Sequence, residues 1–154
     1  MSRKTYICVF RLITAVLKRS NMTYRFEPIK GKCGEIVESI LSDNLMPQDK
    51  ELIFKIRLCV EEVAENIVQY AYPDGDGWME ASVDIETSQV SIEFKDSGSP
   101  FDPLAKPDPD LTLGVEDRPI GGLGIFLCKQ FMDSIDYRYE DGCNILKMSK
   151  KLSV

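Results

Sequence analysis

Two neighbouring stretches of the sequence alternate strictly between apolar and polar residues, and this pattern limits the fold more than any other feature. Residues 79–86 and 90–95 each carry an apolar side chain at every second position, and the short turn 87–89 joins them. A strand of this kind has one apolar and one polar face. The pattern predicts a sheet with one buried face and one face exposed to solvent, so helices must pack on the buried face.

Asp96 ends the second of these strands and falls on its apolar face, which Val90, Ile92 and Phe94 define. A carboxylate on a buried face is costly unless a partner meets it. Gly98 follows two residues later, and glycine permits close approach of a ligand. The position indicates either an aspartate that binds a ligand or a carboxylate that only caps the turn.

Length and composition indicate one ordinary globular domain. The 154 residues are 44% hydrophobic and 29% charged, which allows a sizeable core, and nothing marks a second domain. We expect residues 22–154 to form this domain. Residues 1–21 are basic and partly apolar, too short to span a bilayer and unlike a signal peptide. They are either an N-terminal extension that packs on the domain or a stretch before a true start at Met22.

Charge and residue usage exclude several classes of function. The net charge of -6 argues against a nucleic-acid surface and favours a protein as macromolecular partner. The five cysteines are odd in number and form no C-x-x-C pair, which fits a reducing cytoplasm. Histidine is absent, so catalysis by serine–histidine or cysteine–histidine pairs, histidine metal sites and a histidine phosphoacceptor within the chain are excluded.

The remaining patterns predict the other elements. We expect a strand at 23–27, helices at about 31–44 and 48–72, a helix at 125–132 that is apolar nearly all round and therefore buried, and a closing hairpin of strands 134–140 and 143–151. In the last strand, Asn144 shares a face with Leu146 and Met148. A second polar residue is therefore predicted on the core side of the sheet.

The long helix places two polar residues beside its apolar stripe. At about 100° per residue, Glu62 and Asn66 share one flank of the stripe, whereas Glu61 and Glu65 point into water. The flank is either an ordinary solvated surface or one wall of a cleft. In a cleft, Asn66 offers a carbonyl oxygen to a hard cation such as Mg²⁺. Glu62 is then placed to take a proton from an attacking hydroxyl or water.

A proline-rich loop and a glycine cluster complete the pattern. Residues 102–120 carry four prolines and no sustained period, which is typical of a mobile loop. The loop ends at Gly121-Gly122-Leu123-Gly124, where Gly122 and Gly124 let backbone amides at the start of a helix approach a phosphate. Asp96 can accept a hydrogen bond from the amine at the six position of adenine. The three elements together predict a site for a magnesium nucleotide.

In this order and spacing the three motifs resemble those of the GHKL ATPases, in the branch of anti-sigma-factor serine/threonine kinases. The motifs are Glu62 to Asn66 followed by Ala71-Tyr72-Pro73, then Asp96-x-Gly98-x-Pro100-Phe101-Asp102, and Gly121-Gly122-Leu123-Gly124-Ile125. The similarity covers about residues 22–151. It implies an α/β (α+β) fold, a two-layer sandwich of a mixed, mostly antiparallel sheet with helices on one face, ATP between the layers, and a mobile lid at 102–120.

The resemblance also implies a role for each matching residue. Glu62 would be the general base, Asn66 the magnesium ligand and Asp96 the adenine contact. The further positions expected at the nucleotide are Gly98, Pro100, Gly121, Gly122, Leu123, Gly124 and Asn144. The chain departs from many relatives at Tyr70, where they have histidine, and near Asn144, where they have threonine.

The preferred hypothesis is a small cytoplasmic protein kinase that uses ATP and Mg²⁺. It would phosphorylate a serine or threonine of an antagonist protein and otherwise bind and inhibit a sigma factor or similar regulator; the resemblance alone supplies these partners. No contact with nucleic acid or membrane is expected, and a homodimer is compatible with the sequence. The alternative is a non-catalytic, ATP-responsive binding module. A sensor histidine kinase comes third, because its acceptor histidine would have to belong to another protein.

Overall fold

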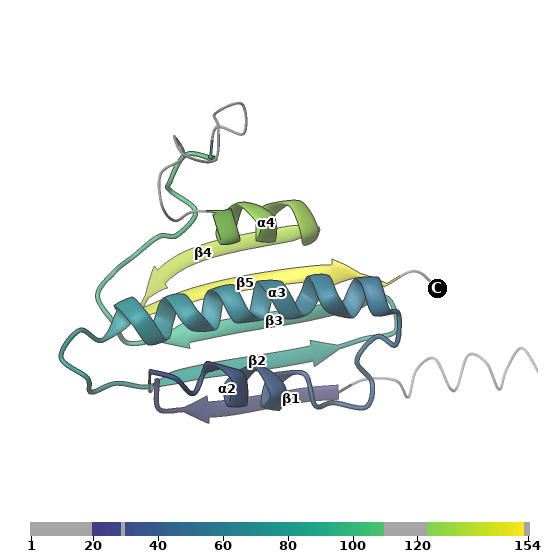
Figure 1. The fold of residues 1–154 in the computed structure, drawn as a ribbon, viewed down its shortest axis with the longest axis horizontal. Helices are drawn as coiled ribbons and strands as arrows, with labels where there is room; N and C mark the ends of the chain where they lie inside the picture. The colour runs from purple at the N-terminus through teal and green to yellow at the C-terminus, as the bar shows by residue number, and fades with distance from the viewer. Residues whose placement is uncertain (1–19, 29, 110–122, 153–154) are drawn as a thin grey trace, which may run out of the picture.

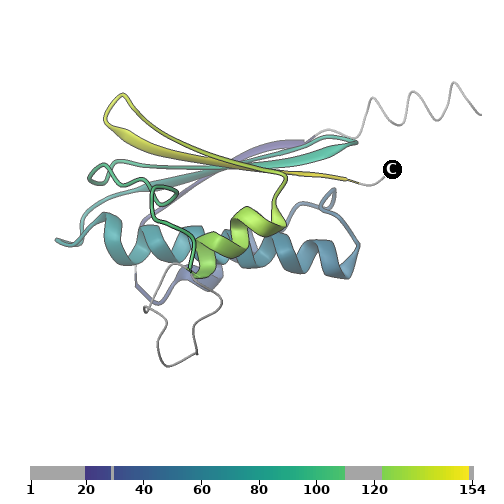
Figure 2. The ribbon, with the colours of Figure 1, turned by 90° about the horizontal axis from the view of Figure 1, so that it is seen from above.

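The computed structural model describes residues 20–28, 30–109 and 123–152, which form an antiparallel sheet with helices on one face (Figures 1 and 2). In chain order the elements are β1 (Ser20–Phe26), α2 (Cys33–Ile40), α3 (Lys50–Asn66), the π-helix η1 (Ile67–Ala71), β2 (Met79–Ile85), β3 (Gln89–Asp96), α4 (Leu123–Phe131), β4 (Ser134–Glu140) and β5 (Cys143–Lys151). The predicted two-layer α/β sandwich is therefore confirmed.

The strands lie in the order β1-β2-β3-β5-β4. Every pairing among the described strands is antiparallel, so the mixed character that was expected of the sheet is absent from this part of the chain. Hairpins join β2 to β3 and β4 to β5, and β5 then returns beside β3. This return brings the C-terminal end of β3 next to the start of β5, where Asp96 lies opposite Asn144.

The alternation of β2 and β3 defines the inner face of the sheet as predicted. The apolar residues of both strands are buried, and the two rows meet across the hairpin, with Val83 opposite Ile92 and Ala81 opposite Phe94. Their burial beneath the helices removes apolar surface from water and provides the main stabilisation of the fold.

The helix layer lies on one face of the sheet, with α3 between α2 and α4 (Figures 1 and 2). The side chain of Asp49 caps α3 by accepting a hydrogen bond from the backbone N–H of Leu52 at 2.7 Å. Ile56, Val60 and Val63 on the predicted stripe are buried against the sheet. The stripe fixes the rotation of α3, and this rotation directs the flank that carries Asn66 toward the end of the sheet.

Three boundaries differ from the predictions. β1 begins at Ser20 rather than residue 23, and pairs there with Ile85. α2 spans only Cys33–Ile40, because the side chain of Asp43 accepts a hydrogen bond from the backbone of Leu45 at 2.7 Å and holds the chain in a turn. The long helix changes at residue 67 to a π-helical turn, which apolar periodicity does not distinguish from an α-helical one.

The prediction that the helix at 125–132 is buried holds for one side of it. Ile125, Cys128 and Met132 are buried, whereas Phe126 and Leu127 are only half-buried, because α4 lies beside α3 and one side faces the core. None of the described helices is long and apolar enough to cross a membrane. The four cysteines within the described residues are free thiols.

Candidate functional site

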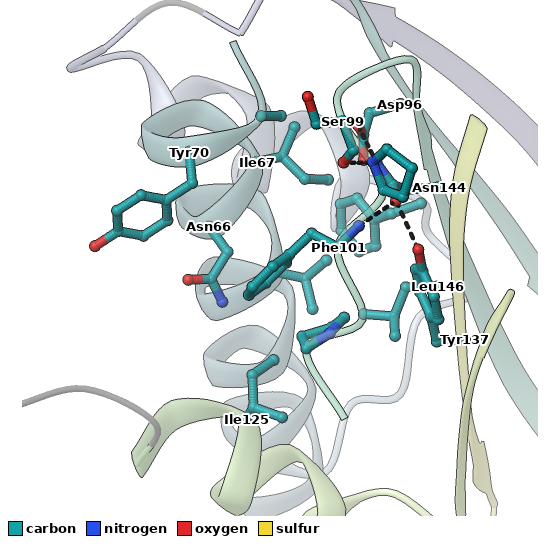
Figure 3. A pocket seen from close by; sticks show the side chains of 15 residues that line it. Asn66, Ile67, Tyr70, Asp96, Ser99, Phe101, Ile125, Tyr137, Asn144 and Leu146 are labelled. Carbon is teal, nitrogen blue, oxygen red and sulfur yellow. Dashed lines mark hydrogen bonds between the residues drawn. The ribbon is translucent and has the colours of Figure 1, made fainter. Parts of the chain in front are cut away.

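A cavity of about 240 Å³ lies between the helices and the sheet, where β3 ends and β5 begins (Figure 3). It brings together the predicted residues Asn66, Asp96, Pro100 and Asn144, which are far apart in the sequence. The lining residues are Val63, Asn66, Ile67, Tyr70, Ala71, Phe94, Asp96, Ser99, Pro100, Phe101, Pro103, Ile125, Tyr137, Asn144 and Leu146. Most are apolar, so the cavity suits a flat, largely apolar group that carries a few polar atoms.

Asp96 is the buried acid of this cavity, with only 5% of its surface exposed. Its Oδ1 accepts hydrogen bonds from the backbone N–H of Gly98 at 2.8 Å and from Asn144 Nδ2 at 3.0 Å. Burial raises the pKa of the Asp96 carboxyl, while the bonds from Asn144 and Gly98 act in the opposite direction. Both bonds from the described residues reach Oδ1, which leaves Oδ2 as an acceptor for a ligand amine.

Asn144 ties β5 to the loop that follows β3. Its Nδ2 donates to Asp96 Oδ1 and to the backbone oxygens of Gly98 at 3.3 Å and Ser99 at 3.0 Å. Its Oδ1 accepts from the backbone N–H of Phe101 at 3.0 Å and from the Tyr137 hydroxyl at 2.7 Å. All polar atoms of the amide are therefore engaged (Figure 3), which favours a positioning role over a direct polar contact with a ligand.

Gly98 lies in a space that no side chain can share. A Cβ at this position would lie 2.7 Å from the backbone oxygen of Ala71 and 2.9 Å from Asp96 Oδ1. The end of η1 therefore packs directly on the loop. Tyr72, just beyond η1, strengthens this junction, because its hydroxyl donates to the backbone oxygen of Trp78 and accepts from the backbone N–H of Ser97.

The predicted pairing of Glu62 and Asn66 on one flank of α3 is confirmed. Asn66 Nδ2 donates to Glu62 Oε1 at 3.0 Å, and both side chains are half-buried. This bond engages Nδ2 of the amide and leaves Oδ1 without a hydrogen bond from the described residues. Asn66 is the last residue of α3, directly before the π-helical turn; π-turns within helices are frequent at functional sites.

A second cavity of about 40 Å³ adjoins the first and is lined by charged residues. The two cavities share Asn66, Phe101, Pro103 and Ile125. The residues that line only the second are Glu62, Lys106, Pro107, Asp108, Phe126 and Lys129. An apolar cavity with a single buried acid thus continues into a charged one, which matches the two ends of a nucleotide.

The first turn of α4 packs against Glu62. A Cβ on Gly124 would lie 1.9 Å from Glu62 Oε2, so the helix backbone passes immediately beside the carboxylate. Leu123, also predicted at the nucleotide, is exposed and lines neither cavity. Gly121 and Gly122 lie outside the described residues, as does the predicted lid beyond residue 109.

A divalent cation fits this site only together with phosphate oxygens. Among the described residues, no three histidine, cysteine, aspartate or glutamate side chains lie close enough to hold a metal ion by themselves. Within the described residues, Asn66 Oδ1 accepts no hydrogen bond and is a possible ligand, and Mg²⁺ commonly completes its six positions with water and phosphate. The donor set therefore fits a nucleotide-bound magnesium ion rather than a resident one.

Sequence analysis missed several polar residues of the site, among them Tyr137, Lys106, Asp108 and Lys129. Tyr137 lines the first cavity and is hydrogen-bonded to Asn144. Lys106 and Lys129 line the second cavity. Lys129 follows Ile125 by four positions, so helical spacing places it on the same face and could have identified it. Lys106 carried no such signal, because it lies in an irregular loop.

Fold and site together define a class: an α/β sandwich domain with a cavity between its sheet and its helices that suits a nucleotide. The chain belongs to the histidine kinase-like ATPase domain family, whose model matches residues 32–150. The family expected from the three motifs is thus confirmed, and with it ATP as the nucleotide of the class.

The relatives found are protein kinases. The chain is 31% identical to the serine/threonine-protein kinase BtrW of Bordetella bronchiseptica over 102 residues, which are 64% of this chain and 70% of that protein. It is 30% identical to the serine-protein kinase RsbW of Bacillus cereus over 95 residues, 59% of each chain. The RsbW of Halalkalibacterium halodurans is 32% identical over 101 residues, 63% of this chain and 61% of that protein.

A solved structure shares the fold. The structure of the RsbU and RsbW domains of Rv1364c from Mycobacterium tuberculosis superimposes with a TM-score of 0.59 and 10% identity. The match covers 85% of this chain and 31% of that chain. The chain thus spans less than two thirds of the RsbW relatives and about a third of the mycobacterial chain. The similarity therefore concerns a single domain of these proteins rather than their full length.

Proposed function

We propose that the chain is an ATP-dependent serine/threonine protein kinase that acts as an anti-sigma regulatory factor. The observation that carries this proposal is the Glu62 carboxylate, which lies beside Asn66 and against the first turn of α4 in the charged cavity. The kinase relatives support the reaction type, and the resemblance supports the partners. These are an antagonist protein with a serine or threonine acceptor and a sigma factor or similar regulator, in a cytoplasm where the free thiols stay reduced.

Each of the two cavities would bind a different part of ATP. The apolar cavity would hold the adenine ring, with Asp96 Oδ2 accepting from its six-position amine. The charged cavity and the N-terminal end of α4, which favours negative charge, would hold the phosphates. Asn66 Oδ1 would hold the magnesium ion, which supplies charge neutralisation to the phosphates when bound.

Glu62 acts on the protein substrate. The acceptor hydroxyl oxygen attacks the terminal phosphorus, the bond from that phosphorus to the bridging oxygen breaks, and ADP leaves. The hydroxyl proton passes to Glu62, whose carboxylate is held by the bond from Asn66 Nδ2 and by the packing of Gly124. Most of the rate enhancement in such a transfer comes from positioning and charge stabilisation, and the base adds a further share.

The substitution Glu62→Gln tests the proposal, because glutamine is nearly isosteric and cannot accept the proton. Candidate acceptors are small antagonist proteins encoded close to this gene, and transfer of labelled phosphate from ATP to them is measured together with ATP affinity. We expect transfer to fall by about two to four powers of ten while ATP affinity stays within a few-fold. Glu65→Gln is the matched control, because Glu65 is exposed on the same helix and lines neither of the two cavities.

The outcomes separate the proposal from its alternative. Transfer by the Glu62→Gln protein at the wild-type rate removes Glu62 as the base. A wild-type protein that binds ATP and a partner tightly but transfers nothing to the antagonist rules out the kinase. The chain would then be the non-catalytic, ATP-responsive binding module.

A further inference from the structure

We propose that Lys129 binds the terminal phosphates of the nucleotide, and that Asp108 holds the lysine ammonium until a nucleotide displaces it. The proposal rests on the nucleotide site described above and adds a residue pair that the three motifs do not include. Lys129 belongs to α4, and Asp108 belongs to the loop after β3. The two residues therefore join separate parts of the chain across the charged cavity.

The position of Lys129 is set by the helix. Ile125, one turn earlier on the same face of α4, lines both cavities, and Lys129 lines the second one with Glu62 and Asn66. The proposed general base and metal ligand thus border the same small space as the Lys129 side chain. A phosphate that reaches Glu62 lies within range of a flexible four-carbon side chain.

The present partner of Lys129 is a carboxylate. Its Nζ lies 2.8 Å from Asp108 Oδ1, and the side chains are 25% and 52% exposed, respectively. An ion pair as exposed as this one contributes little net free energy and is readily exchanged. A phosphate carries more charge than a carboxylate and makes strong charge-assisted hydrogen bonds to an ammonium group. Exchange of Asp108 for phosphate is therefore favourable.

The charges of the cavity favour such an exchange. Its lining contains two carboxylates, Glu62 and Asp108, and two ammonium groups, Lys106 and Lys129. The Lys106 ammonium lies 5.6 Å from the centre of the Phe101 ring, at the edge between the two cavities. Phosphates that approach Glu62 meet its negative charge, and a Lys129 released from Asp108 adds a second positive charge to that of Lys106. The ion pair thus keeps a positive charge close to the site at which the phosphates need it.

The test is calorimetric titration of ATP, ADP and AMP into wild type, Lys129→Gln, Asp108→Asn and the double variant. We expect Lys129→Gln to weaken ATP binding about ten-fold and AMP binding less than two-fold, because AMP lacks the terminal phosphates. Asp108→Asn should tighten ATP binding about two- to five-fold by removing the competitor. In the double variant the gain from Asp108→Asn should vanish, since the gain depends on the lysine.

Two further variants keep the test specific. Lys129→Arg retains the charge and should bind ATP within about three-fold of wild type. Lys55→Gln is the matched control, because Lys55 also pairs with an exposed carboxylate, that of Glu51 at 2.5 Å, but on α3 outside both cavities. Its ATP affinity should equal that of wild type.

Each contrary result has one meaning. Equal ATP affinity of Lys129→Gln and wild type overturns the role of Lys129, and an equal loss for ATP and AMP assigns it to general structure instead. Unchanged affinity of Asp108→Asn overturns the competition. Absence of ATP binding by the wild type refutes the proposed function itself. This result is distinguishable from a failure of the Lys129 proposal, in which the wild type still binds ATP.

Discussion

The substitution Asp96→Asn should separate ligand binding from stability. Oδ1 of Asp96 accepts the hydrogen bonds from Gly98 and Asn144, and the amide oxygen of the variant can accept both in the same place. The variant then presents an NH₂ group where Oδ2 stood. The six-position amine of adenine is a donor as well, so the variant loses one hydrogen bond and leaves a buried donor unpaired.

The expected loss of affinity follows from this geometry. A buried polar group without its partner costs about 1–3 kcal/mol, which corresponds to roughly a five- to 150-fold weaker affinity for ATP. The cavity is largely apolar around Asp96, so water compensates poorly and the upper half of the range is expected. Calorimetric titration of ATP into the folded variant measures the loss directly.

The stability of the nucleotide-free protein should change in the opposite direction. Burial raises the pKa of Asp96, so between its unfolded-state pKa and this raised pKa the folded state binds the extra proton. The unfolding free energy of the wild type therefore falls as pH rises through that window. At neutral pH the variant buries no charge, and its NH₂ group faces the cavity when no nucleotide fills it, so the variant should be the more stable protein. Its advantage in urea unfolding should shrink as the pH is lowered through the raised pKa.

A matched control is Asp102→Asn, which removes a charge from an exposed carboxylate on the same loop. Asp102 accepts a hydrogen bond from the backbone of Leu104 at 2.8 Å and lines neither cavity. It should leave ATP affinity within two-fold. Wild-type affinity of Asp96→Asn would mean that Asp96 only caps the turn, and a less stable variant at neutral pH would contradict the cost assigned to the buried charge.

Two other substitutions test the remaining contacts. Asn66→Ala should lose the magnesium-dependent part of ATP affinity but keep the fold; titration with and without Mg²⁺ measures this, and unchanged dependence would remove Asn66 as ligand. Gly98→Ala should lower the unfolding free energy by about 1–3 kcal/mol, because its Cβ meets the backbone oxygen of Ala71 at 2.7 Å. Gly34→Ala in α2 is the control, because nothing lies within 4 Å and the helix should gain stability. Equal effects of the two glycine substitutions would refute the contact.

The sheet and the flanks of α3 could be predicted from the sequence because burial determines both. Two-residue alternation defines which side of β2 and β3 faces the helices, and the apolar stripe of α3 defines its rotation. Once these are set, Asp96 and Asn144 must face the core, and Glu62 and Asn66 must share a flank. The element boundaries were less predictable, since a single side-chain hydrogen bond such as that of Asp43 ends a helix early.

The charged cavity could not be predicted, because it depends on where an irregular loop returns. Lys106 and Asp108 belong to a proline-rich stretch without periodicity, and their positions follow from tertiary contacts rather than local pattern. The sequence also could not show that every polar atom of the Asn144 amide is hydrogen-bonded. Its five hydrogen-bond partners come from β3, β4 and the loop, which only the folded chain brings together.

The two ends of the site differ in how far they are organised before ATP binds. At the adenine end, Asn144 and the junction at Gly98 hold Asp96 in place, so binding the base requires little rearrangement. At the phosphate end, Lys129 is paired with Asp108 and Glu62 lies against α4, so entry of the phosphates requires exchange of an ion pair. A preorganised end contributes affinity at low entropic cost. At an end that must exchange an ion pair, the affinity depends on how many phosphates the ligand brings. The adenine end should therefore supply an affinity common to AMP, ADP and ATP, and the charged cavity should distinguish among them.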